Sequence, residues 1–361
     1  MQNSFAVHAS HPGIHAGIQK LISQHGCAIH ASLFDPQVYI FTCPNIDGAV
    51  GFKKLSGIAV SMGPPLCASN DISQLTTAYR MFCKQNNMSR IYVAATGAFL
   101  NFARSEKYGL IETGKEQIVD VKTFSVSKSM TSYCKNAYNA GIRIHELAIP
   151  TDELLDQLKF ASLQHQLTTL ANKAVERRKG TQVYTCGVQP FAAPTIMRWF
   201  YATQTIGNQH PMPVGLLVLL KIGHRQYAID NCLQIDEIDG TKINRNVTHT
   251  LIIHMLKHID ADFVSFHVTE IEKLGEITGF SRFQERIIRW GYGSFDKLLH
   301  SNGKQMFRDR YAKSTATPSY LVFDPPRLNM AHAFAPMQAV HVSRKKVVSL
   351  LFGKVRRLLF S

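Results

Sequence analysis

Three acidic residues stand close together in the loop 235–246, IDEIDGTKINRN: Asp236, Glu237 and Asp239. The loop leaves a strand-like segment and leads to a helical pattern that starts near Val247. A strand, a polar loop and a helix N-terminus together form an arrangement that binds anions or acyl groups. A carboxylate there can act as a base or hold an ammonium group. Acidic loop residues are also commonly exposed without a chemical role, so both interpretations stay open.

A second candidate site is the segment 118–147, in which a strand pattern passes through the turn FSVSKS into a helix. Ser125 and Ser127 are candidate caps for a helix that starts near Lys128. Lys128 and Lys135 are seven residues apart and therefore share one helix face. Together with the amides at the helix start, they predict a phosphate site. The alternative is a solvated helix edge that carries two lysines.

The elements that position these residues follow a mixed α/β order. In the first half, the pattern predicts strands at 38–44, 57–63, 90–96, 118–124 and 142–150, and helices at 73–87, 97–109 and 128–141. In the second half, it predicts helices at 151–180 and 245–259, and strands at 197–204, 213–223, 224–234, 261–268 and 320–325. The strands 213–223 and 224–234 form a hairpin that turns at Gly223 and His224.

Pro150 marks a break between the two halves, and the chain is long enough for two cores. We expect an N-terminal domain over 1–148, a catalytic domain over 149–338 and a terminal helix over 339–361. The sequence has no apolar run of transmembrane length and no signal-peptide pattern at its start, which favours a cytoplasmic protein.

Metal chemistry is disfavoured by the cysteine and histidine spacing. The seven cysteines are scattered and never form a CxxC pair, so reduced thiols are expected. His254 and His258 are four residues apart on a predicted helix, but the glutamate of an HExxH motif is missing. We therefore predict no metal site.

The formal charge of +15 is concentrated at the end of the chain, where seven basic residues follow Asp324 and no acidic residue does. The terminal segment SRKKVVSLLFGKVRRLLFS places leucines and a valine on one helical stripe. Its expected membrane-binding residues are Lys345, Lys346, Lys354, Arg356 and Arg357. The segment predicts a peripheral helix on an anionic membrane, with packing on the protein body as the alternative and RNA binding as a third.

Motifs of common nucleotide enzymes are missing: the sequence has no GxxxxGK, GxGxxG or GxSxG pattern and no kinase set. The element order of the second half suits a GNAT acyltransferase. The basic, glycine-rich turn that holds the pyrophosphate of acetyl-CoA is not evident, so an acyl donor other than CoA has to be considered.

Several segments resemble the C-terminal domain of phosphatidylglycerol lysyltransferases over roughly residues 50–325. They are GFKKLSGIAVSMGPPLCA, YGLIETGKEQIVDVKTFSVSKSMTSYCKNAYNAGIRIHEL, VERRKGTQVYTCGVQPF, MRWFYATQ, PVGLLVLL, RQYAIDNCLQ and FDKLLHSNGKQMFRDRYAKSTATPSYLVF. The likeness is greatest to stand-alone and fungal-type members that modify sterols. It implies mixed α/β, tandem GNAT-like domains and transfer of an aminoacyl group from aminoacyl-tRNA to a lipid hydroxyl at the membrane.

The resemblance also implies partners and site residues. The partners are tRNA, an anionic membrane lipid and an aminoacyl-tRNA synthetase, and the reaction needs no further cofactor. Asp236 and Asp239 are the implied catalytic acids. The implied binding residues for tRNA or phosphate are Lys304, Arg308, Arg310, Lys313, Lys128 and Lys135. The sequence departs from the family in two places: the family's DFPGAPNGT loop is replaced by DEIDGTKINRN, and its run of lysines is reduced to Lys128 and Lys135. Two alternative functions therefore stay open, a CoA-dependent N-acyltransferase and a non-catalytic binding module.

Overall fold

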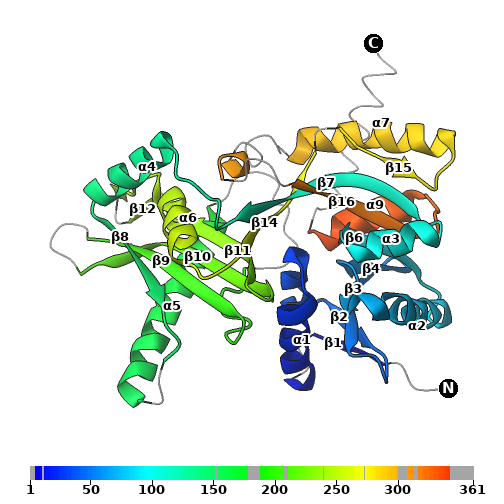
Figure 1. Ribbon diagram of the computed structural model, residues 1–361, viewed down its shortest axis with the longest axis horizontal. Coiled ribbons are helices and arrows are strands. Elements are labelled where there is room, and N and C mark those ends of the chain that lie inside the picture. Colours follow the sequence, from blue (N-terminus) through cyan, green and yellow to red (C-terminus); the bar gives the residue numbers. More distant parts are fainter. Residues whose placement is uncertain are drawn as a thin grey trace, which may run out of the picture. The chain divides into compact units, whose positions relative to one another are not determined.

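The computed structural model describes residues 5–9, 12–150, 153–177, 188–205, 210–238, 240–271, 273–299, 307–311 and 316–341. These residues form two compact units. Unit 1 contains the described residues up to Ile118 and those from Phe266 onward, and unit 2 contains those from Val119 to Ser265. The division differs from the expected domains 1–148 and 149–338, because strands from both parts of the chain build the sheet of unit 1 (Figure 1).

Unit 1 is built on a mixed sheet with the order β1-β2-β3-β4-β6-β16-β7. These strands are β1 (Phe5–His8), β2 (Tyr39–Thr42), β3 (Gly48–Leu55), β4 (Ile58–Met62), β6 (Ser89–Ala95), β16 (Ala316–Asp324) and β7 (Gly109–Asp120), and β5 (Leu66–Cys67) and β15 (Ile277–Thr278) pair with β3 and β7. Strands β4 and β6 are parallel, and the other described pairs are antiparallel. The late strand β16 lies between β6 and β7, with Asp324 opposite Arg90 and Ala316 opposite Gln117.

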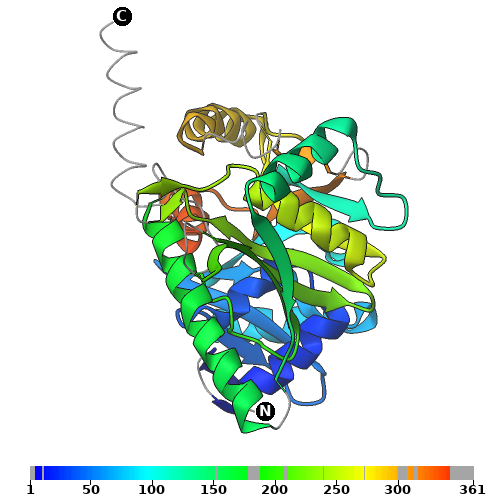
Figure 2. The same cartoon turned by 90° about the vertical axis from the view of Figure 1, so that its left-hand side faces the viewer.

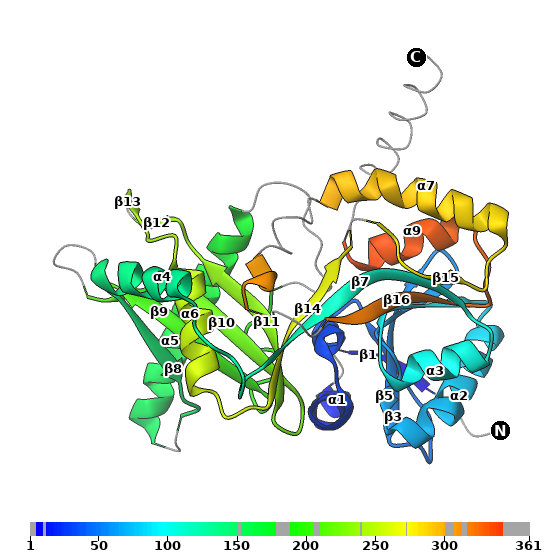
Figure 3. The same cartoon turned by 45° about the horizontal axis from the view of Figure 1, so that its top comes forward.

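Helices cover both faces of this sheet (Figure 3). Helices α2 (Ile72–Gln85) and α3 (Ala98–Ser105) lie on one face, while α1 (Pro12–His25), the 3-10 helix η1 (Ala28–Phe34) and α9 (Met330–Ala339) contact the sheet from the other. Two neighbouring residues of β3 contact helices on opposite faces of the sheet. The Phe52 ring packs against Tyr79 of α2, whereas Lys53 reaches the carbonyl of Ala339 in α9. This alternation is that of a strand with two covered faces.

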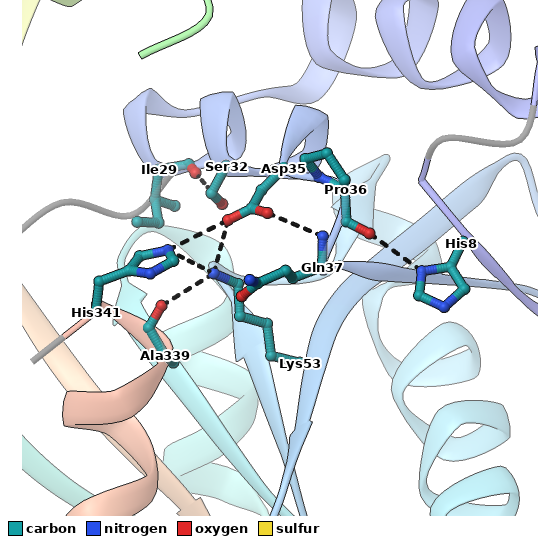
Figure 4. A network of polar contacts seen from close by, with 9 residues as sticks. All are labelled: His8, Ile29, Ser32, Asp35, Pro36, Gln37, Lys53, Ala339 and His341. Carbon is teal, nitrogen blue, oxygen red and sulfur yellow. Dashed lines mark hydrogen bonds and ion pairs between the residues drawn. The ribbon is translucent and has the colours of Figure 1, made fainter. Parts of the chain in front are cut away.

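A buried ion pair joins β3 to the end of η1, and the same lysine also reaches the end of α9 (Figure 4). Lys53 Nζ lies 2.8 Å from Asp35 Oδ2, and both side chains are at most 5% exposed. The same ammonium group donates to the Ala339 carbonyl at 3.2 Å and lies 3.1 Å from His341 Nε2. The same His341 Nε2 lies 3.4 Å from Asp35 Oδ2, so the imidazole borders both members of the ion pair. Burial from water raises the pKa of Asp35, but hydrogen bonds from Lys53 and Gln37 outweigh it and keep the pKa below its ordinary value.

Unit 2 contains the strands β14, β11, β10, β9 and β8 in that order. They are β8 (Ile142–Leu147), β9 (Met197–Gln204), β10 (Met212–Gly223), β11 (Gln226–Gln234) and the start of β14 (Phe263–Glu270). Helices α4 (Lys128–Asn139) and α6 (Val247–His258) lie together on one side, and α5 (Leu154–Glu176) packs on β10 and β11 from the other (Figure 2). The seven residues 214–220 of β10 are all buried, as expected for a strand covered on both faces.

Glycine allows α6 to approach β10 closely. A Cβ atom on Gly215 would lie 2.5 Å from Val247 Cγ1 and 3.0 Å from Leu251 Cδ1. The hairpin between β10 and β11 turns at His224 and Arg225, one residue later than predicted, and Arg225 takes a positive φ of 54° there. No helix in the described ranges is both long and apolar enough to cross a membrane. The predicted mixed α/β class is confirmed.

Candidate active site

Strand β11 contains a bulge, and its extra residue is Asp230. Leu219 of β10 lies opposite Ile229. Its neighbour Val218 lies opposite Asn231, so Asp230 has no opposite residue in this ladder. Such bulges bend a strand, redirect a side chain and are frequent beside active sites. The bulge therefore distinguishes Asp230 from its neighbours on β11.

The surroundings of Asp230 favour its neutral form. Burial removes the carboxylate from water and raises the pKa of Asp230 from 3.8 to about 6, although a hydrogen bond from Asn231 acts in the opposite direction. Asn231 Nδ2 donates that bond to Asp230 Oδ2 at 2.6 Å. A carboxyl group whose pKa lies near neutrality can both accept and return a proton in a reaction. Asp230 thus has the acid–base properties of a general base.

Asp230 also lies just beyond the place where two parallel strands stop pairing. The ladder between β11 and β14 joins Gln226, Tyr227 and Ala228 to residues 263–265 and extends no further in the described register. In α/β sheets, ligands bind at the carboxyl ends of parallel strands. The position of Asp230, two residues past the last pair, is therefore suited to a substrate.

The N-terminus of α6 is fixed at the end of β11. Gln234 Oε1 accepts hydrogen bonds from the Thr248 backbone N–H at 3.1 Å and from Thr248 Oγ1 at 2.8 Å. The start of a helix carries partial positive charge and attracts anions. The predicted sequence of strand, loop and helix N-terminus is thus present, with Asp230 on its strand.

The loop between β11 and α6 carries the acids that the sequence pointed to. Asp236 is exposed, and its carbonyl accepts a hydrogen bond from Ile243 N at 2.8 Å. Glu237 forms a half-exposed ion pair with Arg177 at 3.2 Å. Asp239 lies outside the described residues. The carboxylate of Asp236 is therefore accessible to substrate, whereas Asp230 is half-buried.

Helix α4 carries the two predicted lysines, and its C-terminal end, next to Lys135, contacts this loop. Ser127 caps the helix by accepting a hydrogen bond from Met130 N at 3.3 Å, as predicted. Lys128 and Lys135 are both exposed. The neighbouring carbonyl of Asn136 accepts a hydrogen bond at 3.3 Å from Asn244, which belongs to the loop before α6. The structure thus places one end of α4 beside the loop that carries Asp236.

The predicted cluster 304–313 is only partly described, and its arginines differ. Arg308 is largely buried in unit 1, where it donates to the carbonyl of Val268 at 2.9 Å and to the hydroxyl of Thr269. Burial lowers the pKa of Arg308. Arg308 therefore fixes the turn 307–311 on β14, and its contact with a phosphate stays a prediction. Arg310 is exposed.

Several predicted residues cannot be placed because they lie outside the described residues. They are Lys304 and Lys313 of the cluster and Lys345, Lys346, Lys354, Arg356 and Arg357 of the terminal helix.

The histidines of α6 contact one another and α4. The His254 and His258 rings stack with centroids 4.1 Å apart, and His258 Nδ1 bonds to the His254 carbonyl at 2.7 Å. His249 stacks on Tyr133 of α4. Within the described ranges, no group of three or more metal-ligating side chains comes together.

The sequence-based reasoning missed Asp230. A signal was present in the segment YAIDNCLQ, where two polar residues interrupt an otherwise regular strand. The bulge itself depends on the register with β10, which the sequence of β11 does not contain.

Comparison with known proteins connects this arrangement to a family. Residues 22–177 match the family model described as "Phosphatidylglycerol lysyltransferase, C-terminal". None of the curated proteins matches the chain at a significant level. The matched region ends before β11, so Asp230 and the loop 235–246 lie beyond it.

Solved structures extend the likeness to most of the chain. L-PGS from Bacillus licheniformis aligns with a TM-score of 0.68 at 12% identity, covering 93% of this chain and 98% of that one. A domain described as the C-terminal domain of a lysylphosphatidylglycerol synthetase from Agrobacterium fabrum gives 0.68 at 9% identity, with coverages of 91% and 96%. A conserved protein of unknown function from Bacteroides thetaiotaomicron gives 0.52 at 9% identity, with coverages of 90% and 99%. At these identities the matches show the fold, and they agree with the predicted α/β class. The resemblance seen in the sequence is thereby confirmed over residues 22–177, which are similar to the C-terminal family of phosphatidylglycerol lysyltransferases.

Proposed function

We propose that the protein transfers an aminoacyl group from aminoacyl-tRNA to the hydroxyl of a lipid, either phosphatidylglycerol or a sterol, at a membrane surface. The observation that carries this proposal is the match of residues 22–177 to the lysyltransferase family. The fold likeness over nine-tenths of the chain supports it. In this proposal the donor is the charged tRNA, supplied by an aminoacyl-tRNA synthetase, and no further cofactor takes part.

In the proposed mechanism, Asp230 moves the proton. The lipid hydroxyl attacks the carbonyl carbon of the aminoacyl ester and passes its proton to the Asp230 carboxylate. The new ester bond forms as the bond to the terminal ribose oxygen of tRNA breaks, and Asp230 returns the proton to that oxygen. No covalent enzyme intermediate is needed, because both substrates are held together in one site. The bulge and the pKa of about 6 are the properties that suit Asp230 to this role.

The exposed charges have supporting roles in the proposal. Asp236 is accessible beside the strand end and orients the acceptor or the α-amino group of the donor. Lys128 and Lys135 lie on the exposed face of α4 and bind tRNA phosphates, and Arg310 is a further phosphate contact. Asp239, Lys304 and Lys313 remain candidates from the sequence alone.

The test uses the purified full-length chain, aminoacyl-tRNAs charged with radiolabelled amino acids, and vesicles that contain phosphatidylglycerol or a sterol. We expect label to appear in the lipid extract and mass spectrometry to identify the donor and the acceptor together. Asp230→Asn should lower the transfer rate by about a hundredfold or more, which is typical for loss of a general base. Asp236→Asn is the matched variant and should lower it less.

Two outcomes would contradict the proposal. Absence of transfer with every charged tRNA, combined with saturable acetyl-CoA binding in calorimetry, would favour a CoA-dependent N-acyltransferase. Absence of both would favour a non-catalytic binding module. Unchanged transfer by the Asp230→Asn protein would leave the reaction standing and remove Asp230 from its mechanism.

A further inference from the structure

Helix α7 (Arg282–Leu299) of unit 1 exposes a stripe of large apolar side chains. Phe283, Ile287 and Trp290 are 72%, 43% and 46% exposed. Their spacing of four and three residues places them on one face of the helix. A single exposed apolar residue is ordinary, whereas three in line on one helix form a continuous surface.

The opposite side of α7 is hydrogen-bonded to the rest of unit 1, and these bonds determine the orientation of the apolar stripe. Arg289 donates to the carbonyl of Leu274 at 2.9 Å and to that of Gly275 at 3.2 Å. Tyr292 donates its hydroxyl to the carbonyl of Ile271 at 2.6 Å. These bonds hold the helix against the segment 271–275, so the stripe faces away from it. Figures 1 and 3 both show α7 along the outside of unit 1.

The charges around the stripe are positive. Arg282 and Arg286 are exposed on the first turns of α7. Glu285 is the one acidic residue among 282–292, and it pairs with Arg289 at 3.0 Å. An exposed stripe of Phe, Ile and Trp bordered by arginines is the pattern of helices that lie in the interface of an anionic membrane. Tryptophan itself favours that interface.

We propose that α7 docks the protein on an anionic lipid surface, with Phe283, Ile287 and Trp290 between the acyl chains and Arg282 and Arg286 at the headgroups. A protein partner with an acidic groove fits the arginines but not the line of three large apolar side chains as well as lipid does. Its residues are different from those of the terminal helix predicted over 339–361. The inference stands on α7 alone and does not depend on aminoacyl transfer.

Trp290 provides a direct test, because the chain has only two tryptophans and the other, Trp199, is 1% exposed. The full-length protein is mixed with vesicles of phosphatidylcholine alone or of an equal mixture with phosphatidylglycerol. We expect a blue shift of the emission and quenching by brominated acyl chains with the anionic vesicles only. The proposal would be overturned if the protein floats with the vesicles but the Trp290 emission neither shifts nor is quenched, because another surface would then bind the membrane.

Variants that retain the reporter test the stripe and the charges separately. The double change Phe283→Ser and Ile287→Ser should weaken vesicle binding about tenfold or more, since two apolar side chains no longer leave water. Arg282→Gln with Arg286→Gln should weaken it by about thirtyfold, at the usual contribution of two basic residues near an anionic surface. Unchanged binding by both variants would exclude α7.

Matched controls address folding and self-association. Met81 and Met330 of unit 1 are 60% and 64% exposed and lie outside α7. Their joint replacement by serine should leave binding unchanged, and an equal loss would show that general hydrophobicity is responsible. All variants should keep the circular dichroism of the parent. If light scattering instead shows a dimer that the Phe283→Ser and Ile287→Ser protein loses, and no vesicle binds, the stripe contacts a second copy and the proposal fails.

Discussion

Replacing Asp230 by Asn should make the folded protein more stable at neutral pH while it slows the reaction. The folded-state pKa of Asp230 is about 6, against an ordinary value of 3.8. In this case the unfolded chain releases the proton first as the pH rises, so folding loses free energy between about pH 4 and pH 6. Asn has no proton to lose, and its oxygen can still accept the hydrogen bond from Asn231.

The expected gain follows from the size of the shift. A difference of about two pKa units corresponds to about 3 kcal/mol at neutral pH, taken as an upper bound. Below about pH 4, both states carry a neutral side chain at this position, and the two proteins should be equally stable. The gain should therefore appear gradually as the pH rises and stay constant above about pH 7.

The assay is urea unfolding of both proteins at a series of pH values, followed by circular dichroism. Asp236→Asn serves as the control for the substitution itself, because Asp236 is exposed. The reasoning is refuted if Asp230→Asn changes stability equally at all pH values, or if it destabilises the protein at neutral pH. A transfer rate that rises with pH through an apparent pKa near 6 in the parent, and is flat in the variant, would tie the same carboxyl to the chemistry.

Three further outcomes are expected. Lys53→Met should destabilise unit 1 by about 3–5 kcal/mol in chemical unfolding, because it leaves the Asp35 carboxylate buried without its partner, and the double variant with Asp35→Asn should recover most of the loss. Gly215→Ala should cost about 1–3 kcal/mol in the same assay, since the added methyl group has no room beside α6, and an unchanged midpoint would show that the helix can shift. Lys128→Gln with Lys135→Gln should weaken tRNA binding and lower the slope of log affinity against log salt by about one to two, and an unaltered slope in filter binding would exclude α4 as a tRNA surface.

The local elements could be predicted because their signals lie within short segments. The helix at 128–139 could be predicted because Ser127 is a suitable N-cap and Gly141 follows the last turn. The buried strand β10 is a continuous apolar run, and the helix after the acidic loop has a regular apolar face. Boundaries set by hydrogen bonds across the chain could not be seen in the same way. β7 begins at Gly109, and only its last part was recognised as a strand.

The candidate site was predicted only in outline, because burial and strand register are not visible in the sequence. The loop with Asp236 and the start of α6 were found, since polar residues after a strand are visible in the sequence. Asp230 was not, because its position as an extra residue is defined only by pairing with β10. Arg308 was read as a surface charge, although it is turned into unit 1. The sequence does not show whether a basic side chain is exposed to solvent or hydrogen-bonded to backbone carbonyls.

The position of β16 between β6 and β7 has a consequence for how the protein is made. Its residues are synthesised after the other strands of this sheet, yet they pair with β6 and β7, which end at Ala95 and Asp120. Unit 2 is one continuous stretch of chain from Val119 to Ser265 in the described residues, so it can fold while synthesis continues. Until β16 is synthesised, the edges of β6 and β7 in unit 1 remain unpaired, and unpaired strand edges promote aggregation. A nascent chain stalled before Ala316 should therefore need chaperone protection, whereas one released after Asp324 should not.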